Sequence, residues 1–330
     1  MLVSAQAILV SLLVAIAFLV AIRTVDLNER EPLWALGILF VLGAVAALAV
    51  DLMVGSTVLE LTILPSAIAR EVSKFVATAA GLGILAVVSR SRGWSEINGP
   101  MDGIVYGATA GLGFAAGTTF LREITTTTEV IGVLPLWSAL VGNFLSGLAE
   151  GVFAAIGGLG LAVAAHARTT GTKVGAALGS LALAVLLHAG FDWFARGGAL
   201  GGAASARAWI ALLLPLVLVG AVVAMSISRE RRAIASQLAA EIATGAVSDE
   251  DRRVLSSWSD RQAMYLKLLL RFRVREWSVL TTLHNWQVQL ALTRARESRE
   301  TDERRRGQLR EELEHLRAAV VSLKAELRAD

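Results

Sequence analysis

The stretch from Pro65 to Val88, PSAIAREVSKFVATAAGLGILAVV, decides what kind of protein this is. It exceeds the roughly 20 residues that an apolar helix needs to cross a bilayer, yet it holds Arg70, Glu71 and Lys74. A charge near the bilayer centre costs roughly 2.5–3.5 kcal/mol on insertion scales, so ionisable residues in a span indicate a functional site by default. The segment therefore predicts a membrane-embedded protein whose chemistry lies among its stranded charges.

The composition of the whole chain also favours a membrane protein. Hydrophobic residues make up 55% of the 330 residues, charged residues only 18%, and the mean hydropathy is +0.61. The chain has no cysteine, which excludes disulfides and thiolate metal sites. Six further apolar stretches are candidate spans: Leu2–Ile22, Trp34–Val54, Ile104–Phe120, Val133–Ala165, Val174–Phe194 and Trp209–Ile227. We expect an all-α fold, a polytopic membrane helix bundle of about seven spans.

Two of these spans contain residues that could break a helix. Pro65 begins the third span, and Pro135 and the Gly142-Asn143 pair lie in the fifth. Such residues could separate a short re-entrant or interfacial piece from the span that follows. An eighth membrane element is therefore left open.

Positive charges in the short loops predict the orientation of the chain. With the C-terminus inside, the outer loops carry only Arg122, Arg196 and Arg207. The inner side then carries Arg23, Arg30, Arg90, Arg92, Arg168, Lys173, Arg229, Arg231 and Arg232. We expect the N-terminus outside, the C-terminus in the cytoplasm, and the first span retained as an anchor because no basic residue precedes it.

In this orientation the ionisable residues of different spans reach the same depth. Glu71 and Lys74 lie early in a descending span, Glu150 lies in the outer half of another, and His188 and Asp192 end a rising one. Each residue of a helix advances about 1.5 Å, so all five fall in the outer half of the membrane. We therefore expect a polar cluster of Glu71, Lys74, Glu150 and His188.

The roles of the carboxylates remain open at this point. Glu71 and Lys74 are three residues apart, so they could simply neutralise each other in lipid, or Glu71 could bind a water or a metal with His188. Glu150 has no charged neighbour in sequence. It is either protonated or paired across helices with Lys74, Arg70 or His188.

His188 and Asp192 are four residues apart and share a helix face. The carboxylate could fix the tautomer of the imidazole, as in many acid–base sites. The alternative, slightly favoured for Asp192, is a half-solvated pair at the membrane surface. His188 lies deeper and is the better candidate for chemistry.

Small residues predict which spans pack closely. The pairs Gly107/Gly111, Gly113/Gly117 and Gly147/Gly151 have the small-xxx-small spacing that lets helix backbones approach in lipid. We expect the spans that carry them, the fourth and the fifth, to pack directly on each other.

After Ile227 the composition changes to that of a charged helical tail. Residues 1–226 hold 11 Lys/Arg against 12 Asp/Glu, whereas residues 227–330 hold 20 against 16. The interleaved signs are typical of a solvated helix face, which argues against nucleic-acid binding. We divide the chain into a membrane domain, 1–228, and a cytoplasmic helical tail, 229–330.

The tail contains several helix signals. A first helix over Arg229–Thr244 should end at Gly245, Ser248 begins a capping box, and a long helical run extends from Arg261 to about Glu300. Heptads follow over 309–327, at Leu309, Leu313, Leu316, Val320, Leu323 and Leu327. Packing within the tail and homo-oligomerisation through a coiled coil are both consistent with so short a repeat.

Three motifs on successive spans resemble a known family. Glu71-Val72-Ser73-Lys74 after Pro65, the run from Asp102-Gly103-Ile104-Val105-Tyr106-Gly107 into Gly111-Leu112-Gly113-Phe114-Ala115, and Leu187-His188-Ala189-Gly190-Phe191-Asp192 are similar, in order and spacing, to those of the PrsW family of intramembrane proteases within the CAAX protease superfamily. The resemblance covers about residues 30–225.

The resemblance implies an endopeptidase in a bacterial plasma membrane that cuts membrane-anchored regulatory proteins near the bilayer. Glutamates and histidines would activate water there. It leaves open a glutamic mechanism or one that uses a divalent metal, such as zinc.

Three residues depart from the pattern that the resemblance implies. The first glutamate of Glu-Glu-x-x-Lys is Arg70, the glutamate of Phe-x-x-x-Glu is Thr118, and an intervening histidine is Glu150. Glu71, Lys74, His188 and Asp192 remain. The candidate catalytic residues are those four together with Arg70 and Glu150.

Two functions are consistent with this altered set. In the favoured one the chain has lost proteolysis and binds membrane-anchored regulatory proteins, with its tail recruiting a cytoplasmic partner. In the other it is an active, divergent endopeptidase that uses Glu71, Glu150 and His188. A transporter with a midplane site is disfavoured because no inverted repeat is visible.

Overall fold

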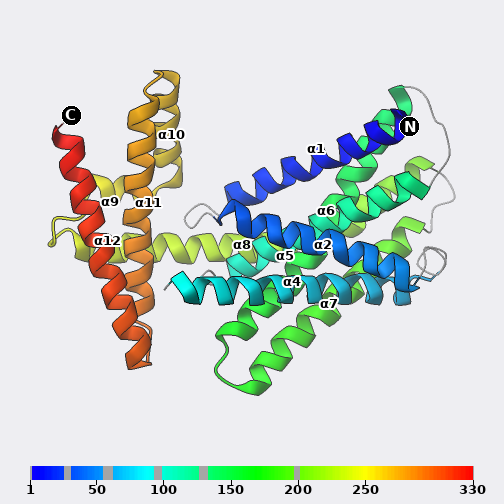
Figure 1. Cartoon of the computed structure of the whole chain (residues 1–330), viewed down its shortest axis with the longest axis horizontal. Helices are drawn as coiled ribbons and strands as arrows, with labels where there is room; N and C mark the ends of the chain where they lie inside the picture. The colour runs from blue at the N-terminus through cyan, green and yellow to red at the C-terminus, as the bar shows by residue number, and fades with distance from the viewer. Residues whose placement is uncertain are drawn as a thin grey trace. The chain divides into compact units, whose positions relative to one another are not determined.

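The computed structural model describes residues 2–25, 31–54, 62–92, 99–125, 133–196 and 201–329, and these residues form eleven helices and no strand (Figure 1). The helices are α1 (Leu2–Val25), α2 (Leu33–Val54), α4 (Leu64–Arg92), α5 (Pro100–Thr125), α6 (Val133–His166), α7 (Thr170–Arg196), α8 (Gly201–Glu241), α9 (Asp249–Ser256), α10 (Trp258–Leu270), α11 (Val274–Glu297) and α12 (Glu303–Ala329). The all-α prediction is confirmed.

Six helices are long and apolar enough, over their described residues, to cross a membrane. They are α2, α4, α5, α6, α7 and α8. The predicted first span is also a helix, α1, but its described apolar part, Leu12–Ile22, is shorter than the others. The polytopic helix bundle is confirmed, with six candidate spans in the described residues where seven were predicted.

The prolines do not break their helices. Pro65 is the second residue of α4 and Pro135 the third of α6, and both helices are continuous. A proline is tolerated in the first turn because the N–H that it lacks would have no acceptor within the helix. The described chain therefore contains no eighth membrane element.

Glycines bring α5 against α6. A Cβ atom on Gly111 would lie 2.2 Å from the carbonyl oxygen of Glu150, and one on Gly107 would lie 2.4 Å from that of Ala154. The α5–α6 pair is the most extensive helix contact among the described residues. The predicted direct packing of these two spans is confirmed, and it depends on the missing side chains of Gly107 and Gly111.

The other small pairs contact different neighbours. A Cβ on Gly113 would lie 1.9 Å from the carbonyl oxygen of Phe40, so this face of α5 packs against α2. A Cβ on Gly147 would lie 3.3 Å from the ring of Phe18 on α1. Helix α5 is thus enclosed between α2 and α6, which makes it the centre of the membrane unit.

The chain forms two compact units, one extending to Val223 and the other beginning at Ala224. Both positions lie within α8, a single helix from Gly201 to Glu241. The prediction of a separate tail helix beginning at Arg229 is therefore wrong, because apolar and charged segments form one uninterrupted helix. The domain boundary at residue 228 stays a prediction.

The helix signals of the tail unit are confirmed in part, because the capping box at Ser248 forms whereas α8 ends at Glu241, before the predicted Thr244. The turn after α8 ends at Gly245, whose φ of +77° is one that glycine adopts without strain. The capping box before α9 forms, with Ser248 and Asp251 each accepting the other's backbone N–H, at 3.1 and 3.0 Å. The long run from Arg261 is not one helix, because Phe272 adopts φ 54° between α10 and α11.

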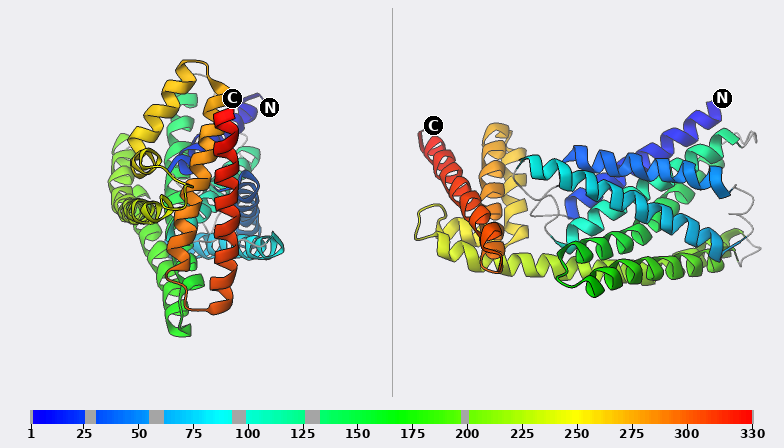
Figure 2. Two further views of the ribbon diagram at one scale, coloured as in Figure 1. Left: turned by 90° about the vertical axis from the view of Figure 1, so that its left-hand side faces the viewer. Right: turned by 60° about the horizontal axis from the view of Figure 1, so that its bottom comes forward.

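The heptad stripe of α12 lies inside the tail unit. Helix α12 runs beside α11 (Figures 1 and 2), and Leu313 and Val320 are buried in a core with Leu283 and Leu290 of α11. The heptad positions Leu313, Leu316, Val320 and Leu323 therefore pack within the tail unit, whereas the side chain of Leu327 lies outside the described residues. A coiled-coil dimer through the same positions would have to open this core, and it remains an untested prediction.

Candidate functional site

The candidate site begins with two residues one turn apart on α4. Glu71 and Lys74 are separated by three positions, so they share a helix face, and the Nζ of Lys74 lies 2.5 Å from Oε1 of Glu71. Both side chains are buried, that of Lys74 completely. An ammonium group withdrawn from water in this way needs negative partners.

The second carboxylate comes from α6. Oε2 of Glu150 lies 2.5 Å from the same Nζ of Lys74, so one ammonium binds two carboxylates that are far apart in the sequence. Nη1 of Arg70 lies 3.6 Å from Oε1 of Glu150. The close approach of α5 and α6 supports this placement of Glu150. The atom nearest to a Cβ built on Gly111 would be the carbonyl oxygen of Glu150.

The histidine comes from α7. Nδ1 of His188 lies 2.5 Å from Oε1 of Glu71, while its Nε2 lies 4.0 Å from Oε1 of Glu150 and 3.8 Å from Oδ1 of Asp192. The ring of Phe153 stacks on the imidazole at 4.8 Å between centroids. Glu71 can thus orient the ring through Nδ1, which leaves Nε2 directed at Glu150 and Asp192.

Aromatic rings complete the surroundings of Lys74. Its Nζ lies 5.5 Å from the ring centroid of Phe114 on α5 and 6.0 Å from that of Phe153 on α6. Such rings attract a cation through their negative faces and exclude water from it. The ion pairs therefore lie buried among α4, α5, α6 and α7.

The predicted cluster is confirmed in its geometry. Glu71, Lys74, Glu150 and His188 are all buried, and the contacts Lys74–Glu71, Lys74–Glu150 and His188–Glu71 link them into one cluster. Asp192 and Arg70 lie at the edge, and the Arg70 side chain is 25% exposed. The catalytic roles of these six residues stay predictions.

Asp192 belongs to the cluster more closely than expected. It is only 8% exposed and lies against His188, whereas the neighbouring Trp193 is 62% exposed. The favoured interpretation of Asp192 as a half-solvated surface residue does not fit this burial. Helix α7 turns Trp193 outward and Asp192 inward because adjacent helix positions differ by about 100°.

The substituted position Thr118 does not join the carboxylates. Its hydroxyl donates to the carbonyl oxygen of Ala115 on its own helix, at 2.9 Å. The next residue, Thr119, lies 3.5 Å from Oδ1 of Asn143 on α6. The position that the resemblance assigns to a carboxylate therefore holds a hydroxyl bonded to its own helix.

One buried acid outside this cluster, Glu31, was not anticipated from the sequence. Glu31, just before α2, forms a hydrogen bond with the hydroxyl of Tyr106 on α5, and both residues are buried. Glu31 lies among charged loop residues, so no pattern distinguished it. Only the packing of the segment before α2 against α5 reveals the contact.

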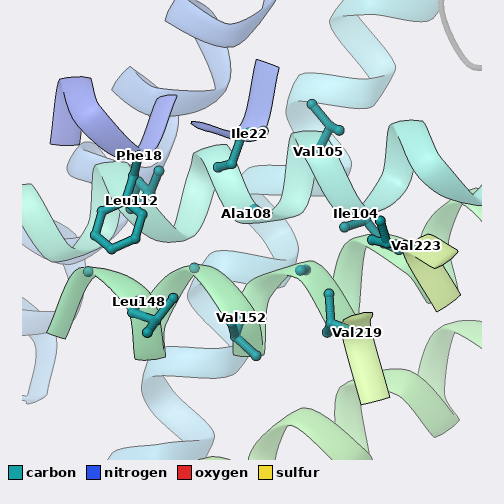
Figure 3. Close-up of a pocket in the computed structure, with 13 residues that line it drawn as sticks. Phe18, Ile22, Ile104, Val105, Ala108, Leu112, Leu148, Val152, Val219 and Val223 are labelled. Atoms are coloured by element: carbon teal, nitrogen blue, oxygen red, sulfur yellow. The ribbon is translucent and has the colours of Figure 1, made fainter. Parts of the chain in front are cut away.

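An apolar groove lies on the far side of the α5–α6 pair from the charges. Figure 3 shows it between α1, α5, α6 and α8, with Phe18, Leu112 and Val152 at its walls and Val219 at one end. Its lining is wholly apolar. Val152 is two positions from Glu150 on α6, so one helix separates an apolar groove from an ionic cluster.

These observations define a class: a polytopic helical membrane protein with a buried carboxylate, lysine and histidine cluster shared by α4, α6 and α7. Residues 31–228 match the family described as PrsW family intramembrane metalloprotease, and the chain belongs to this family. No curated protein and no solved structure matches the chain.

The family description implies a metal, and the donor atoms fit one in kind. Glu71, Glu150 and His188 each offer an oxygen or nitrogen within 4.8 Å of the others, and such donors bind zinc and similar cations. The charges do not fit. The ammonium of Lys74 contacts both carboxylates at 2.5 Å, so a dication between them would face a cation.

Proposed function

We propose that this chain is a PrsW family member that binds membrane-anchored regulatory proteins without cutting them. The observation that carries the proposal is the ammonium of Lys74, bonded at 2.5 Å to both Glu71 and Glu150. A general base must contact the water from which it takes a proton. Here both carboxylates that could activate water already bind a cation.

Arg70 strengthens this interpretation. It stands where the resemblance implies a glutamate, so the substitution replaces a negative charge by a positive one. Its guanidinium lies 3.6 Å from Oε1 of Glu150, and two positive neighbours stabilise the ionised carboxylate. Thr118 removes a further carboxylate. The cluster is therefore suited to hold helices α4, α6 and α7 together.

The apolar groove offers a place for the bound segment. It lies within the membrane unit and has no polar lining, so an apolar membrane anchor would fit its chemistry. We place the protein in a bacterial plasma membrane with its N-terminus outside, and we assign the recruitment of a cytoplasmic partner to the tail.

The test compares the wild-type chain with Glu71→Gln, Glu150→Gln and His188→Ala in proteoliposomes with single-span anchored proteins. We expect co-purification of an anchored protein without cleavage. A Val152→Trp variant, which fills the groove, should lose this binding. Each of the three cluster variants should retain it, provided that the variant remains folded. Cleavage that disappears in the cluster variants would overturn the proposal.

A specific observation favours a second function, that of an active endopeptidase. Nε2 of His188 and Oε1 of Glu150 are 4.0 Å apart, within reach of one shared water, and Glu71 completes a donor set for a metal. A bound metal would polarise the scissile carbonyl or activate water. Lys74 would first have to turn away from both carboxylates.

Metal content separates the two functions independently of activity. Purified protein should hold no stoichiometric zinc by elemental analysis if the ammonium fills the site. A stoichiometric metal that is lost in Glu71→Gln and Glu150→Gln would favour the peptidase instead.

A further inference from the structure

The connection between α10 and α11 exposes an unusual run of residues. We define the α10–α11 tip as residues 266–276, LKLLLRFRVRE. All seven residues from 269 to 275 are exposed. Leu270 is 70% exposed, Phe272 89% and Val274 56%. Single exposed apolar residues are ordinary, but a contiguous set of this kind indicates an interaction surface.

This exposure is not a consequence of a missing core. On the same two helices Tyr265 and Leu283 are buried, and Leu283 belongs to the central core of the tail unit. The helices therefore bury one face and leave the apolar residues of the tip outside it. Figure 1 shows the tip at the end of the α10–α11 hairpin.

Basic residues alternate with the apolar ones. Lys267, Arg271, Arg273 and Arg275 are all exposed, and Glu276 is the one acid of the tip. The net charge of this short segment is therefore strongly positive. Long basic side chains can keep their charge in water while their stems cover apolar surface.

The backbone conformation places an aromatic residue at the apex. Phe272 has φ 54°, and it is the only non-glycine residue with positive φ in the described chain. An aromatic residue adopts this left-handed conformation at a cost, and such strain is concentrated at functional positions. The left-handed conformation of Phe272 falls in the turn between the end of α10 and the start of α11, and the side chain of Phe272 is almost fully exposed there.

We propose that the α10–α11 tip inserts into the interfacial region of the membrane that the chain itself spans. Phe272, Leu270 and Val274 would enter the boundary between headgroups and acyl chains, and the basic residues would bind anionic headgroups. Apolar residues beside a cluster of cations are the combination that lipid surfaces select.

A lipid surface fits the tip better than a second copy of the chain. Two copies meeting at this apex would oppose the same set of basic residues, which is unfavourable. The tail is also tethered to the bilayer through α8, so a weak intrinsic affinity is amplified by a high effective concentration. This inference does not depend on the function proposed for the ionic cluster.

The absence of cysteine from the natural sequence makes a direct test available. We would introduce Phe272→Cys, attach an environment-sensitive fluorophore, and reconstitute the full chain into phosphatidylcholine vesicles with or without phosphatidylglycerol. Nitroxide-bearing lipids then quench a fluorophore that reaches the acyl boundary. Val321→Cys is the matched control, an apolar residue of the same unit that is 49% exposed on α12.

We expect strong quenching at position 272 in the anionic vesicles and little at position 321. Each basic residue near an anionic surface contributes roughly a fivefold factor in affinity. The triple variant Arg271→Gln/Arg273→Gln/Arg275→Gln should therefore weaken insertion by about 100-fold and reduce quenching at 272 to the level at 321. High salt should act in the same direction.

Three results would overturn the proposal. The first is equal quenching at positions 272 and 321. The second is quenching at position 272 that is the same with and without phosphatidylglycerol. The third is quenching at position 272 that increases with the amount of protein per vesicle and not with lipid charge. The last would indicate contact with another protein copy. Hydrogen exchange of α11 amides checks that each variant keeps the tail folded.

Discussion

At the scale of the residue, Lys74 is the side chain on which the membrane site depends. It is fully buried and bonded to two carboxylates from different helices. Removing one partner of a buried ion pair leaves an uncompensated charge, which costs more than the pair itself contributes. The lysine therefore has a structural role whichever chemistry the site performs.

We expect Lys74→Met to destabilise the membrane unit by about 3–5 kcal/mol, because two carboxylates would remain buried without their ammonium. The measurement is thermal unfolding in detergent. Lys173→Met, on the exposed start of α7, should leave the midpoint unchanged.

A second substitution checks the cause of this loss. Adding Glu150→Gln to Lys74→Met removes one of the stranded charges and should recover part of the stability, which a double-mutant cycle quantifies. Equal midpoints for Lys74→Met and the wild type would contradict a role for the ammonium in holding α4 to α6.

His284 predicts how the tail responds to pH. Burial lowers the pKa of His284 from 6.5 to about 4, and Tyr265 lies 2.9 Å from its Nδ1. Nearby, Asp251 raises this pKa while Arg261 and Lys324 lower it. Because the folded pKa lies below the unfolded one, the unfolded state binds more protons between these values, and stability falls as pH drops from 6.5 to 4.

The free energy of unfolding of the tail unit should fall by about 3 kcal/mol between pH 6.5 and pH 4. The measurement is hydrogen exchange of α11 amides in the full chain, which should become faster over this range. His284→Gln should flatten the slope, whereas His315→Gln, at an exposed position, should preserve it. Burial raises the pKa of Asp251, but hydrogen bonds, including one from Lys324, lower it more, so the net pKa of this carboxyl is below its ordinary value. The stability that Asp251 contributes is lost only as the pH falls below its ordinary pKa of 3.8. Asp251 therefore does not account for a fall in stability between pH 6.5 and pH 4.

At the scale of the element, the α5–α6 contact positions Glu150. Gly107 and Gly111 are close to backbone atoms of α6, whereas Gly113 is close to α2. Helices in lipid gain little from apolar burial against each other, so close van der Waals contact decides their spacing. The sequence predicted that α5 packs on α6, but not which glycine pair makes this contact and which pair contacts α2.

We expect Gly111→Ala to destabilise the fold by about 1–3 kcal/mol through overpacking, because its Cβ would lie 2.2 Å from the carbonyl oxygen of Glu150. Gly83→Ala on α4 is the control, since no heavy atom outside its own helix lies within 4 Å of its Cβ. There the usual helix preference for alanine should raise the thermal midpoint slightly. Equal shifts for both variants would contradict the packing.

At the scale of the whole molecule, hydropathy predicts a membrane unit followed by a charged tail, and the structure contains two compact units. The loop charges predict that the turn near Thr169 and the tail near Thr301 share the cytoplasmic side, with Ser56 on the opposite side.

Single cysteines test this topology in the cysteine-free chain. A membrane-impermeant maleimide should label Ser56→Cys in intact cells, and should label Thr169→Cys and Thr301→Cys only after the membrane is opened. Labelling of Thr301→Cys in intact cells would reverse the predicted orientation.

Six of the seven predicted spans followed from the sequence alone, because hydropathy is a property of short segments. Glu71 and Lys74 are one helical turn apart, so even their pairing was local. The bonds from Lys74 to Glu150 and from Glu71 to His188 join residues of different helices, and only helix packing decides those. The interruption at Phe272 was likewise invisible, since the run around it has a helical pattern throughout. Tertiary structure thus decided which charge neutralises which, because an ion pair depends on distances between helices that no single segment contains.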